Sequence, residues 1–251
     1  MTMNCRVLPH ETGDGAWNMA LDEALLEAVA ADPSAAALRT YEWSEPTLSL
    51  GYFQAIAEAE ADPRWRGAAI VRRPTGGGAL WHDRELTYAV VVPVGHPASR
   101  PSQALYRAIH GAVARRLREL GVDARRRGEA DLTDGGSPGR PFLCFNDRDA
   151  DDVVSGEIKL VGSAQRRRSG AVLQHGSLLL ARSPTTPELA GLADVSGAPP
   201  GALAWAEVLA AELPAALGMT PVPSASRPEE RARAETLRRD VYARSTWTRR
   251  R

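Results

Sequence analysis

IVRRPTGGGALWHDRELTYAVVV, residues 70 to 92, is the stretch of this 251-residue chain on which the fold depends. Its last part alternates apolar and other residues from Leu86 to Val92, which predicts a strand because side chains two positions apart share one face of a sheet. Three consecutive glycines, 76 to 78, precede it. Glycine loses more backbone freedom on folding than any other residue, so a run of three indicates a backbone that approaches another group closely.

Two interpretations of this glycine run are open from the local sequence. In one, the three glycines turn their N–H groups toward a ligand, and Arg72 and Arg73 supply positive charge for a carboxylate or phosphate. In the other, the segment is a glycine-rich hairpin with two solvated arginines. The pattern lacks the Gly-Lys-Ser/Thr ending of a P-loop and the spacing of a dinucleotide fingerprint, which excludes those two phosphate sites.

Helices are expected where apolar residues recur every three or four positions. Ser102 is predicted as an N-cap and Gly121 as a stop for the helix between them, and Ser226 and Glu229 have the spacing of a capping box. The expected helices cover 16–31, 102–120, 187–192 and 201–217, with a last one from about Ser226.

Strands are expected where apolar residues alternate or form short runs, and small polar residues at 162–165 and 174–177 are expected to break two of them. Strands gather in the middle of the chain and helices outside, which favours an α+β fold with a mixed or antiparallel central sheet flanked by helices. One domain is expected at 1–222, followed by a C-terminal helix and a frayed basic tail at 223–251. The expected strands cover 38–43, 47–52, 152–154, 157–161 and 171–180, with a loop at 125–140.

Composition narrows the class of protein. Apolar residues make up 43% and charged residues 25%, as in an ordinary soluble globular protein. The hydrophobic runs are too short to cross a membrane, and the N-terminal residues lack the apolar core of a secretion signal, so a cytoplasmic protein is expected. With two cysteines, Cys5 and Cys144, neither a disulfide scaffold nor a structural metal site is predicted.

The charges balance to zero, which gives no general attraction to nucleic acid or to an anionic membrane. Aromatic residues are sparse at 6% and are not interleaved with the basic runs, so nucleic-acid binding has little support. Of 31 basic residues, Lys159 is the only lysine. Either it is an ordinary surface residue, or it stands where a compact ammonium with a tunable pKa is needed, which arginine does not provide.

Cys144 and Lys159 are fifteen positions apart with a predicted turn between them, so they can meet at one end of a sheet. A neighbouring ammonium favours the nucleophilic thiolate and can stabilise the oxyanion formed when a thiolate attacks a carbonyl. The alternative is a cysteine that only packs in the core. His82 and His175 follow glycine-rich segments and can orient an acyl group or act as a base, or be structural histidines.

Several of these motifs together resemble those of a known protein family. The segments RRPTGGGALWHDRELTY (72–88), CF (144–145), GEIKLVGSAQRR (156–167) and LQHGSLLL (173–180) resemble the lipoate and octanoate attachment family, which shares its catalytic fold with biotin-protein ligases. NMALDEALL (18–26) and RTYEWSEPTLSLGYFQ (39–54) fit as well, so the resemblance covers about residues 15 to 185.

The resemblance implies roles for matching residues. Lys159 would contact the acyl carbonyl or an adenylate phosphate, and the glycine loop and the Gln-His-Gly segment would line a pocket for the acyl chain. The substrate-binding residues it implies are Arg73, Thr75, Gly76, Gly77, Gly78, His82, Gly162, Ser163, Ala164, Gln174, His175 and Gly176.

Within the family, Cys144 favours one reaction over the others. A cysteine fifteen positions before the lysine resembles the transferases that carry octanoate as a cysteine thioester, although the following Asn-Asp also fits ligases. The implied donor is octanoyl-acyl carrier protein, and the implied acceptor is a lipoyl-domain protein, either glycine cleavage H protein or a 2-oxoacid dehydrogenase E2. Cys144 and Lys159 would be catalytic, and no cofactor is expected because a thioester is already activated.

Two rival activities remain. An ATP-dependent lipoate-protein ligase would form lipoyl-AMP with ATP and Mg, hold it with Arg73 and Lys159, and leave Cys144 incidental. A lipoyl amidotransferase would use the cysteine but take its acyl group from another lipoyl domain.

Overall fold

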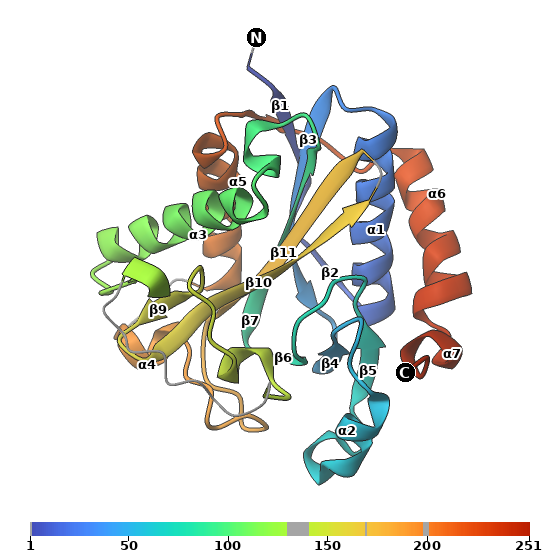
Figure 1. The fold of residues 1–251 in the computed structure, drawn as a ribbon, viewed down its shortest axis with the longest axis vertical. Coiled ribbons are helices and arrows are strands. Elements are labelled where there is room, and N and C mark those ends of the chain that lie inside the picture. The colour runs from blue at the N-terminus through green and yellow to red at the C-terminus, as the bar shows by residue number, and fades with distance from the viewer. Residues whose placement is uncertain (1, 130–140, 169, 198–200) are drawn as a thin grey trace.

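The computed structural model describes residues 2–129, 141–168, 170–197 and 201–251 (Figure 1). Its main sheet is centred on β7 (Glu85–Pro93), which pairs antiparallel with β3 (Ala35–Trp43) on one side and β11 (Ala171–Leu179) on the other. β2 (Glu11–Gly13) pairs with β3 apart from the main row. The order across that row is β12 (Thr220–Pro223), β1 (Asn4–Val7), β3, β7, β11, β10 (Ile158–Arg168), β9 (Val153–Ser155) and β8 (Arg125–Arg126).

Helices cover both faces of this sheet. α1 (Gly15–Ala31) and α6 (Pro228–Leu237) lie on one face, and α3 (Ser102–Glu119) and α5 (Ala202–Ala216) lie on the other (Figure 1). The period-two pattern of β7 explains the two cores, since Tyr88 and Val90 pack on the α3 and α5 side while Ala89 and Val91 pack on the α1 side. The prediction of a mixed sheet flanked by helices is confirmed.

A second, smaller sheet has β4 (Thr47–Leu50) in the middle, parallel to β5 (Ala69–Arg72) and antiparallel to β6 (Leu80–His82). The stretch 70–92 therefore runs through β5, the glycine loop and β6 before entering β7. Its glycines join two strands of the small sheet, β5 and β6, and residues 83–84 lead from β6 into β7 of the main sheet. The small sheet has a core of its own with α2 (Ile56–Ala61), the 3₁₀ turn η1 (Pro63–Trp65) and a Trp65–Trp81 ring pair.

The predicted breaks at 162–165 and 174–177 are wrong, because β10 and β11 run through both segments without interruption. In the antiparallel register Ser163 lies opposite Gly176 and Ala164 lies opposite His175. Small and polar residues were expected to form turns here, but ladder hydrogen bonds to β7 on one side and between the two strands hold the segments extended.

Three helices begin at other residues in the structure than the sequence predicted. Pro101 rather than Ser102 is the N-cap of α3, and the last helix starts at Pro228, where the Arg227 amide donates to Glu230 at 2.7 Å. The predicted helix at 187–192 is a turn followed by the short α4 (Leu192–Val195). Part of the expected loop at 125–140 forms β8 and a 3₁₀ turn, η3 (Arg127–Glu129), and residues 130–140 lie outside the described residues.

The C-terminal segment packs against the small sheet. It consists of the helical turn η5 (Arg238–Tyr242) and α7 (Ser245–Thr248), followed by three arginines. The expectation of a frayed tail does not hold, because the Ile56 amide donates to the Arg251 carbonyl at 3.0 Å and Arg249 pairs with Glu60 at 2.6 Å.

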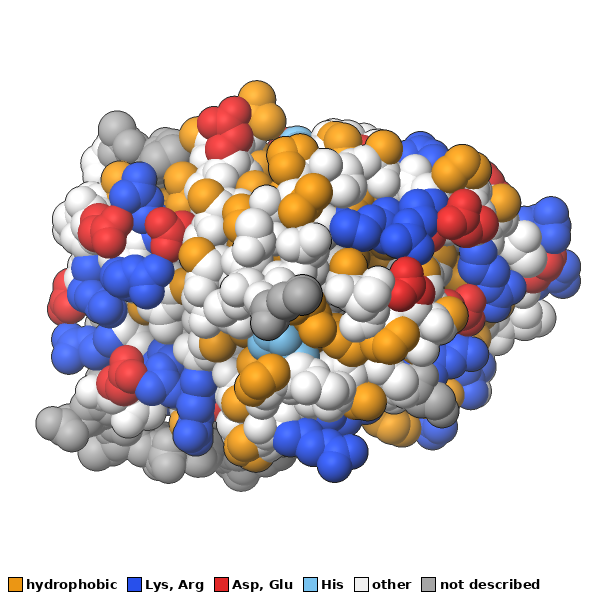
Figure 2. All heavy atoms as spheres, turned by 90° about the horizontal axis from the view of Figure 1, so that it is seen from above, with side chains coloured by type: hydrophobic (Ala, Val, Ile, Leu, Met, Phe, Trp, Pro, Cys, Tyr) orange, Lys and Arg blue, Asp and Glu red, His pale blue; other side chains and the backbone are white. Residues whose placement is uncertain are grey.

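Charge is mixed on the face at the top of Figure 1. Figure 2 shows basic and acidic side chains toward both ends of that face, around a middle of hydrophobic and uncharged atoms. This fits the equal numbers of basic and acidic residues. Among the described residues, no helix combines the length and apolar character needed to span a membrane.

Candidate active site

The glycine loop fixes the position of Cys144. Cys144 begins the 3₁₀ turn η4 (Cys144–Asn146), where its amide donates to the Ala79 carbonyl at 2.7 Å and the Ala79 amide donates to the Phe142 carbonyl at 2.7 Å. A Cβ added to Gly78 would lie 2.9 Å from the Cys144 nitrogen. Only glycine allows this close approach, so the loop holds the backbone of the candidate nucleophile.

Two cavities meet at the half-buried Cys144. One is largely apolar and contains about 350 Å³ of space, including its open mouth. Its walls come from α1, β3, β6, β10 and β11, and the side chains that make it apolar are those of Met19, Tyr41, Trp43 and Leu80. Most of that space is at the open mouth, and the cavity volume itself is about 30 Å³.

The second cavity is a more polar cleft that also reaches Cys144. Gly76 and Gly77 of the glycine loop, Lys159 and His110 line it. Four aspartates lie along the same cleft, namely Asp147, Asp149, Asp151 and Asp152. Ser163 and Ala164 of β10 line both cavities. Cys144 therefore stands where an apolar chain and a polar reactant can meet.

Lys159 and Cys144 converge, as predicted from their spacing. The Lys159 ammonium donates to the Cys144 carbonyl at 3.0 Å and the Asp147 carbonyl at 3.2 Å, and it pairs with Asp152 at 2.8 Å. A Cβ on Gly162 would lie 2.8 Å from the Lys159 side chain, so a glycine there makes room for the lysine.

The electrostatics keep Lys159 charged. Burial acts to lower its pKa, but a negative Cys144 and the Asp152 carboxylate act more strongly, so the pKa of Lys159 lies above its ordinary value. The side chain is only 9% exposed. A buried cation therefore lies against the backbone of Cys144.

Arg73 lines the apolar cavity, but its donors bind the protein itself. Its guanidinium donates to the Ser49 carbonyl at 2.8 Å and to the Gly76 and Gly78 carbonyls at 3.2 and 2.7 Å. Arg72 is fully buried and likewise donates to backbone carbonyls, among them those of Gly51 and Thr248. Arg73 thus shapes the glycine loop and Arg72 ties residues 51–54 to the C-terminal segment, rather than presenting free charge to an anion.

His175 belongs to a buried network behind the cavity. Its Nε2 lies 2.7 Å from the Thr75 hydroxyl and its Nδ1 lies 2.9 Å from Asp22. Asp22 also accepts hydrogen bonds from Tyr41 at 2.9 Å and Arg39 at 2.9 Å. The network ties the glycine loop to α1 and β3, so the contacts of His175 hold the loop in position.

His82 forms a similar network on the opposite wall. Its Nδ1 lies 2.9 Å from Glu85, its Nε2 lies 2.7 Å from the Ser49 hydroxyl, and its ring stacks on Trp43 with centroids 3.7 Å apart. Burial lowers the pKa of His82 more than Glu85 raises it. The ring is therefore a neutral part of the cavity wall at neutral pH.

A third histidine, His110 of α3, faces the polar cleft. Its Nε2 lies 2.8 Å from the Ser163 hydroxyl and 3.1 Å from that of Tyr88, and its Nδ1 contacts the Asp151 carbonyl. Burial is the main reason that its pKa falls to about 4. Gln174 donates to the same Ser163 hydroxyl at 3.0 Å and lies behind the cleft rather than in its wall.

The structure gathers nearly all the predicted residues around Cys144. Thr75, Gly78 and Gln174 support the walls from behind. The predicted residues that line the apolar cavity are Arg73, His82, Gly162, Ser163, Ala164, His175 and Gly176, and those that line the polar cleft are Gly76, Gly77 and Lys159.

Sequence reasoning missed Met19, Asp22, His110 and Asp152. No site residue was predicted in the helix at 16–31, yet α1 contributes Met19 to the cavity wall and Asp22 to the His175 network. An acidic residue inside that apolar helix was the available signal, since a buried carboxylate needs partners.

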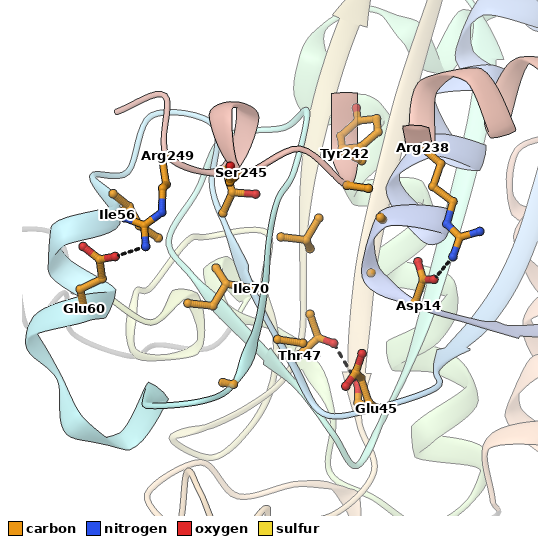
Figure 3. A pocket seen from close by; sticks show the side chains of 17 residues that line it. Asp14, Glu45, Thr47, Ile56, Glu60, Ile70, Arg238, Tyr242, Ser245 and Arg249 are labelled. Atoms are coloured by element: carbon orange, nitrogen blue, oxygen red, sulfur yellow. Dashed lines mark hydrogen bonds and ion pairs between the residues drawn. The ribbon is translucent and has the colours of Figure 1, made fainter. Parts of the chain in front are cut away.

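A larger open pocket lies elsewhere, between α2, β4, β5 and the C-terminal segment (Figure 3). None of the predicted site residues lines it. Most of its charged side chains are paired, with Arg238 on Asp14 and Arg249 on Glu60 (Figure 3). Cavity size alone therefore does not identify the reaction site. In the described part of the chain, no three His, Cys, Asp or Glu residues cluster as metal ligands would.

Known proteins resemble this chain in sequence and fold. The model for the lipoyl protein ligase A/B catalytic domain matches residues 14–188. Octanoyltransferase LipM from Kyrpidia tusciae is 39% identical over 92% of this chain and 94% of that protein. Octanoyltransferase LipM from Geobacillus kaustophilus is 42% identical over 66% of this chain and 61% of that protein. A crystal structure of lipoate-protein ligase A bound with ATP superposes with a TM-score of 0.77 at 25% identity, covering 98% of this chain and 99% of the other.

Proposed function

The chain belongs to the lipoyl protein ligase A/B catalytic domain family, and on that premise we propose that Cys144 and Lys159 carry out an octanoyl transfer in protein lipoylation. The activity is that of an octanoyl acyltransferase, since relatives of that name match at 39% and 42% identity. The observation that carries the mechanism is the position of Cys144, with an apolar cavity on one side and a cleft holding Lys159 on the other.

The first half-reaction loads the cysteine. The octanoyl chain enters the apolar cavity, and the Cys144 thiolate attacks the carbonyl carbon of the thioester on acyl carrier protein. The bond from that carbon to the carrier sulfur breaks, and the carrier leaves as a thiolate that takes up a proton. Lys159 stabilises the attacking thiolate and the charge that develops on the carbonyl oxygen.

The second half-reaction forms an amide. A neutral lysine amine of a lipoyl-domain protein, either glycine cleavage H protein or a 2-oxoacid dehydrogenase E2, attacks the octanoyl-Cys144 carbonyl from the open cleft. The carbon–sulfur bond breaks, Cys144 returns as a thiolate beside Lys159, and the new amide nitrogen loses a proton to solvent. The thioester supplies the activation, so no ATP is needed and the kinetics are ping-pong.

The ligase alternative is less well supported by the geometry. Holding an adenylate would require Arg73 to direct donors at phosphate. Arg73 instead binds Ser49 and the glycine-loop carbonyls. The amidotransferase alternative uses the same cysteine and differs only in its donor.

The test is to offer different donors to one acceptor and follow its acylation by mass. With octanoyl-acyl carrier protein and no ATP, the lipoyl-domain protein should gain one octanoyl group. With free octanoate or lipoate and ATP, neither acylation nor pyrophosphate release is expected. Pyrophosphate release that depends on the free acid would overturn the transferase in favour of the ligase. Faster transfer from an octanoylated lipoyl domain than from carrier protein would establish the amidotransferase.

A further inference from the structure

Three arginines surround one tyrosine beside the glycine loop. The guanidinium carbons of Arg166, Arg250 and Arg251 lie 5.3, 4.6 and 5.7 Å from the ring centroid of Tyr52. Phe53 is 69% exposed, more than any other large hydrophobic side chain described, and its ring lies under Arg251 at 5.3 Å. These five residues are called the basic–aromatic surface below.

This surface carries unneutralised positive charge. Among the described residues, no carboxylate lies within 4.0 Å of Arg166, Arg250 or Arg251, whereas the nearby Arg249 is paired with Glu60. The charges of Arg250 and Arg251 add to burial in lowering the pKa of Arg72. Like charges held together without a counter-ion favour an anionic partner.

The arginines are held in place by the packed C-terminal segment. Trp247 donates from its ring nitrogen to the Arg72 carbonyl at 3.0 Å, and Arg72 donates back to the Thr248 carbonyl at 2.7 Å. Arg249 and Glu60 form the next contact along the segment (Figure 3). Arg250 and Arg251 therefore project from a fixed support, and less side-chain freedom is lost when an anion binds.

The basic–aromatic surface adjoins the mouth of the polar cleft. The Tyr52 amide donates to the Thr75 carbonyl at 2.8 Å, and a Cβ on Gly76 would lie 3.8 Å from the Phe53 ring. Arg166 follows Ala164 by two positions on β10, so both point to the same side of the strand. Gly76 and Ala164 line the cleft that contains Cys144.

The signs of charge around the cleft differ from one side to the other. The cleft itself carries the exposed Asp149, which suits the approach of a lysine ammonium, while Asp151 and Asp152 are paired with Arg126 and Lys159. The basic–aromatic surface suits a partner that brings its thioester on an arm attached through a phosphate. Arginine is the side chain that binds phosphate in a bidentate manner.

We propose that the basic–aromatic surface is the docking site of the donor carrier protein, with Arg166, Arg250 and Arg251 binding the phosphate of its acyl-bearing arm and the acidic surface around it. The proposal rests on the proposed function, because it assumes a carrier-bound octanoyl donor. It assigns the acceptor lysine to the acidic side of the cleft and separates the approach of the two substrates.

The test compares three octanoyl donors in the Arg250→Ala/Arg251→Ala variant and in Arg166→Ala. The donors are octanoyl-acyl carrier protein, octanoyl-4′-phosphopantetheine and octanoyl-pantetheine, which has neither phosphate nor protein. Arg231→Ala is the matched control, since Arg231 also stacks on an aromatic ring, at 5.3 Å from Trp17, in another part of the chain. Melting temperatures verify that each variant is folded.

With the carrier protein, kcat/KM is expected to fall at least tenfold more than with octanoyl-pantetheine, mainly through KM and less so at high salt. An intermediate loss with octanoyl-4′-phosphopantetheine would assign part of the effect to the phosphate. Equal losses with all three donors, an unchanged kcat/KM, or a raised KM for the acceptor protein would overturn the proposal. If the wild-type enzyme does not use octanoyl-acyl carrier protein at all, the proposed function fails instead.

Discussion

The two cavities that meet at Cys144 differ in what holds them together. The walls of the apolar cavity are mostly strands, and buried hydrogen-bond networks around His175 and His82 fix them. The polar cleft is shaped by ion pairs of Lys159 and of Asp151. The difference suggests a division of labour, in which the cavity selects the acyl chain and the cleft supplies charge for the reaction.

The largest expected effect comes from removing charge in the cleft. Lys159→Met should lower transfer by about 10²- to 10³-fold, the usual effect of losing a preorganised stabilising group at a developing charge. It should also destabilise the protein by about 3–5 kcal/mol, because Asp152 is left buried without its partner. Single-turnover rates and thermal unfolding measure the two effects.

Lys159→Met/Asp152→Asn is the companion variant. It should regain most of the lost stability but not the rate, because it removes the unpaired carboxylate without replacing the cation. A double variant that recovered both would show that Lys159 has only a structural role.

Lowering the pH should destabilise the protein mainly through a group in the polar cleft, His110. The pKa of His110 is about 4 in the folded protein and near 6.5 when the chain is unfolded, so the unfolded state takes up a proton first as the pH falls. The contribution of His110 to the free energy of unfolding is therefore fully present above pH 6.5. It declines by about 3 kcal/mol as the pH falls toward 4. Urea titrations at several pH values, compared with His110→Asn, measure the decline. A decline of the same size in His110→Asn would contradict this assignment.

A smaller and more selective effect is expected in the apolar cavity. Ala164→Leu adds three carbons to its wall, which should lower kcat/KM for octanoyl transfer about tenfold, as pocket differences of one or two methylenes do. Transfer of a butyryl group should change much less, since a short chain leaves part of the cavity empty. Equal losses for both chain lengths would show that the chain does not lie along Ala164.

Much of the fold could be predicted because both faces of β7 are buried. Residues that alternate from Leu86 to Val92 belong to two separate cores, one on each face of the sheet. The helical spacing of α1 is equally clear in the sequence. The segments 162–165 and 174–177 were wrongly predicted to interrupt their strands. Their small and polar residues have low strand propensity, but they line the cavity and allow neighbouring strands to pack closely. At Gly176, for example, a Cβ would lie 2.6 Å from the Tyr88 hydroxyl.

The site was predictable where one residue type stood out. A lone lysine among arginines led to Lys159, and its spacing led to Cys144. For Asp22 the only local signal was an acidic residue inside an apolar helix. Met19 and His110 reach the site from helices that are distant in sequence from Cys144, so no local pattern marks them. The packed arginine tail was missed for the same reason, because its partners Tyr52 and Glu60 lie almost two hundred residues earlier.

The most direct test of the account is the intact mass of the enzyme after brief incubation with octanoyl-acyl carrier protein, without ATP and without acceptor. The account predicts one added octanoyl group, removed by hydroxylamine and mapped to Cys144. The same gain is expected in Cys5→Ala, since Cys5 is fully buried in β1, and none in Cys144→Ala. An unacylated wild-type enzyme that still transfers octanoate, or full transfer by Cys144→Ala, would contradict the cysteine mechanism.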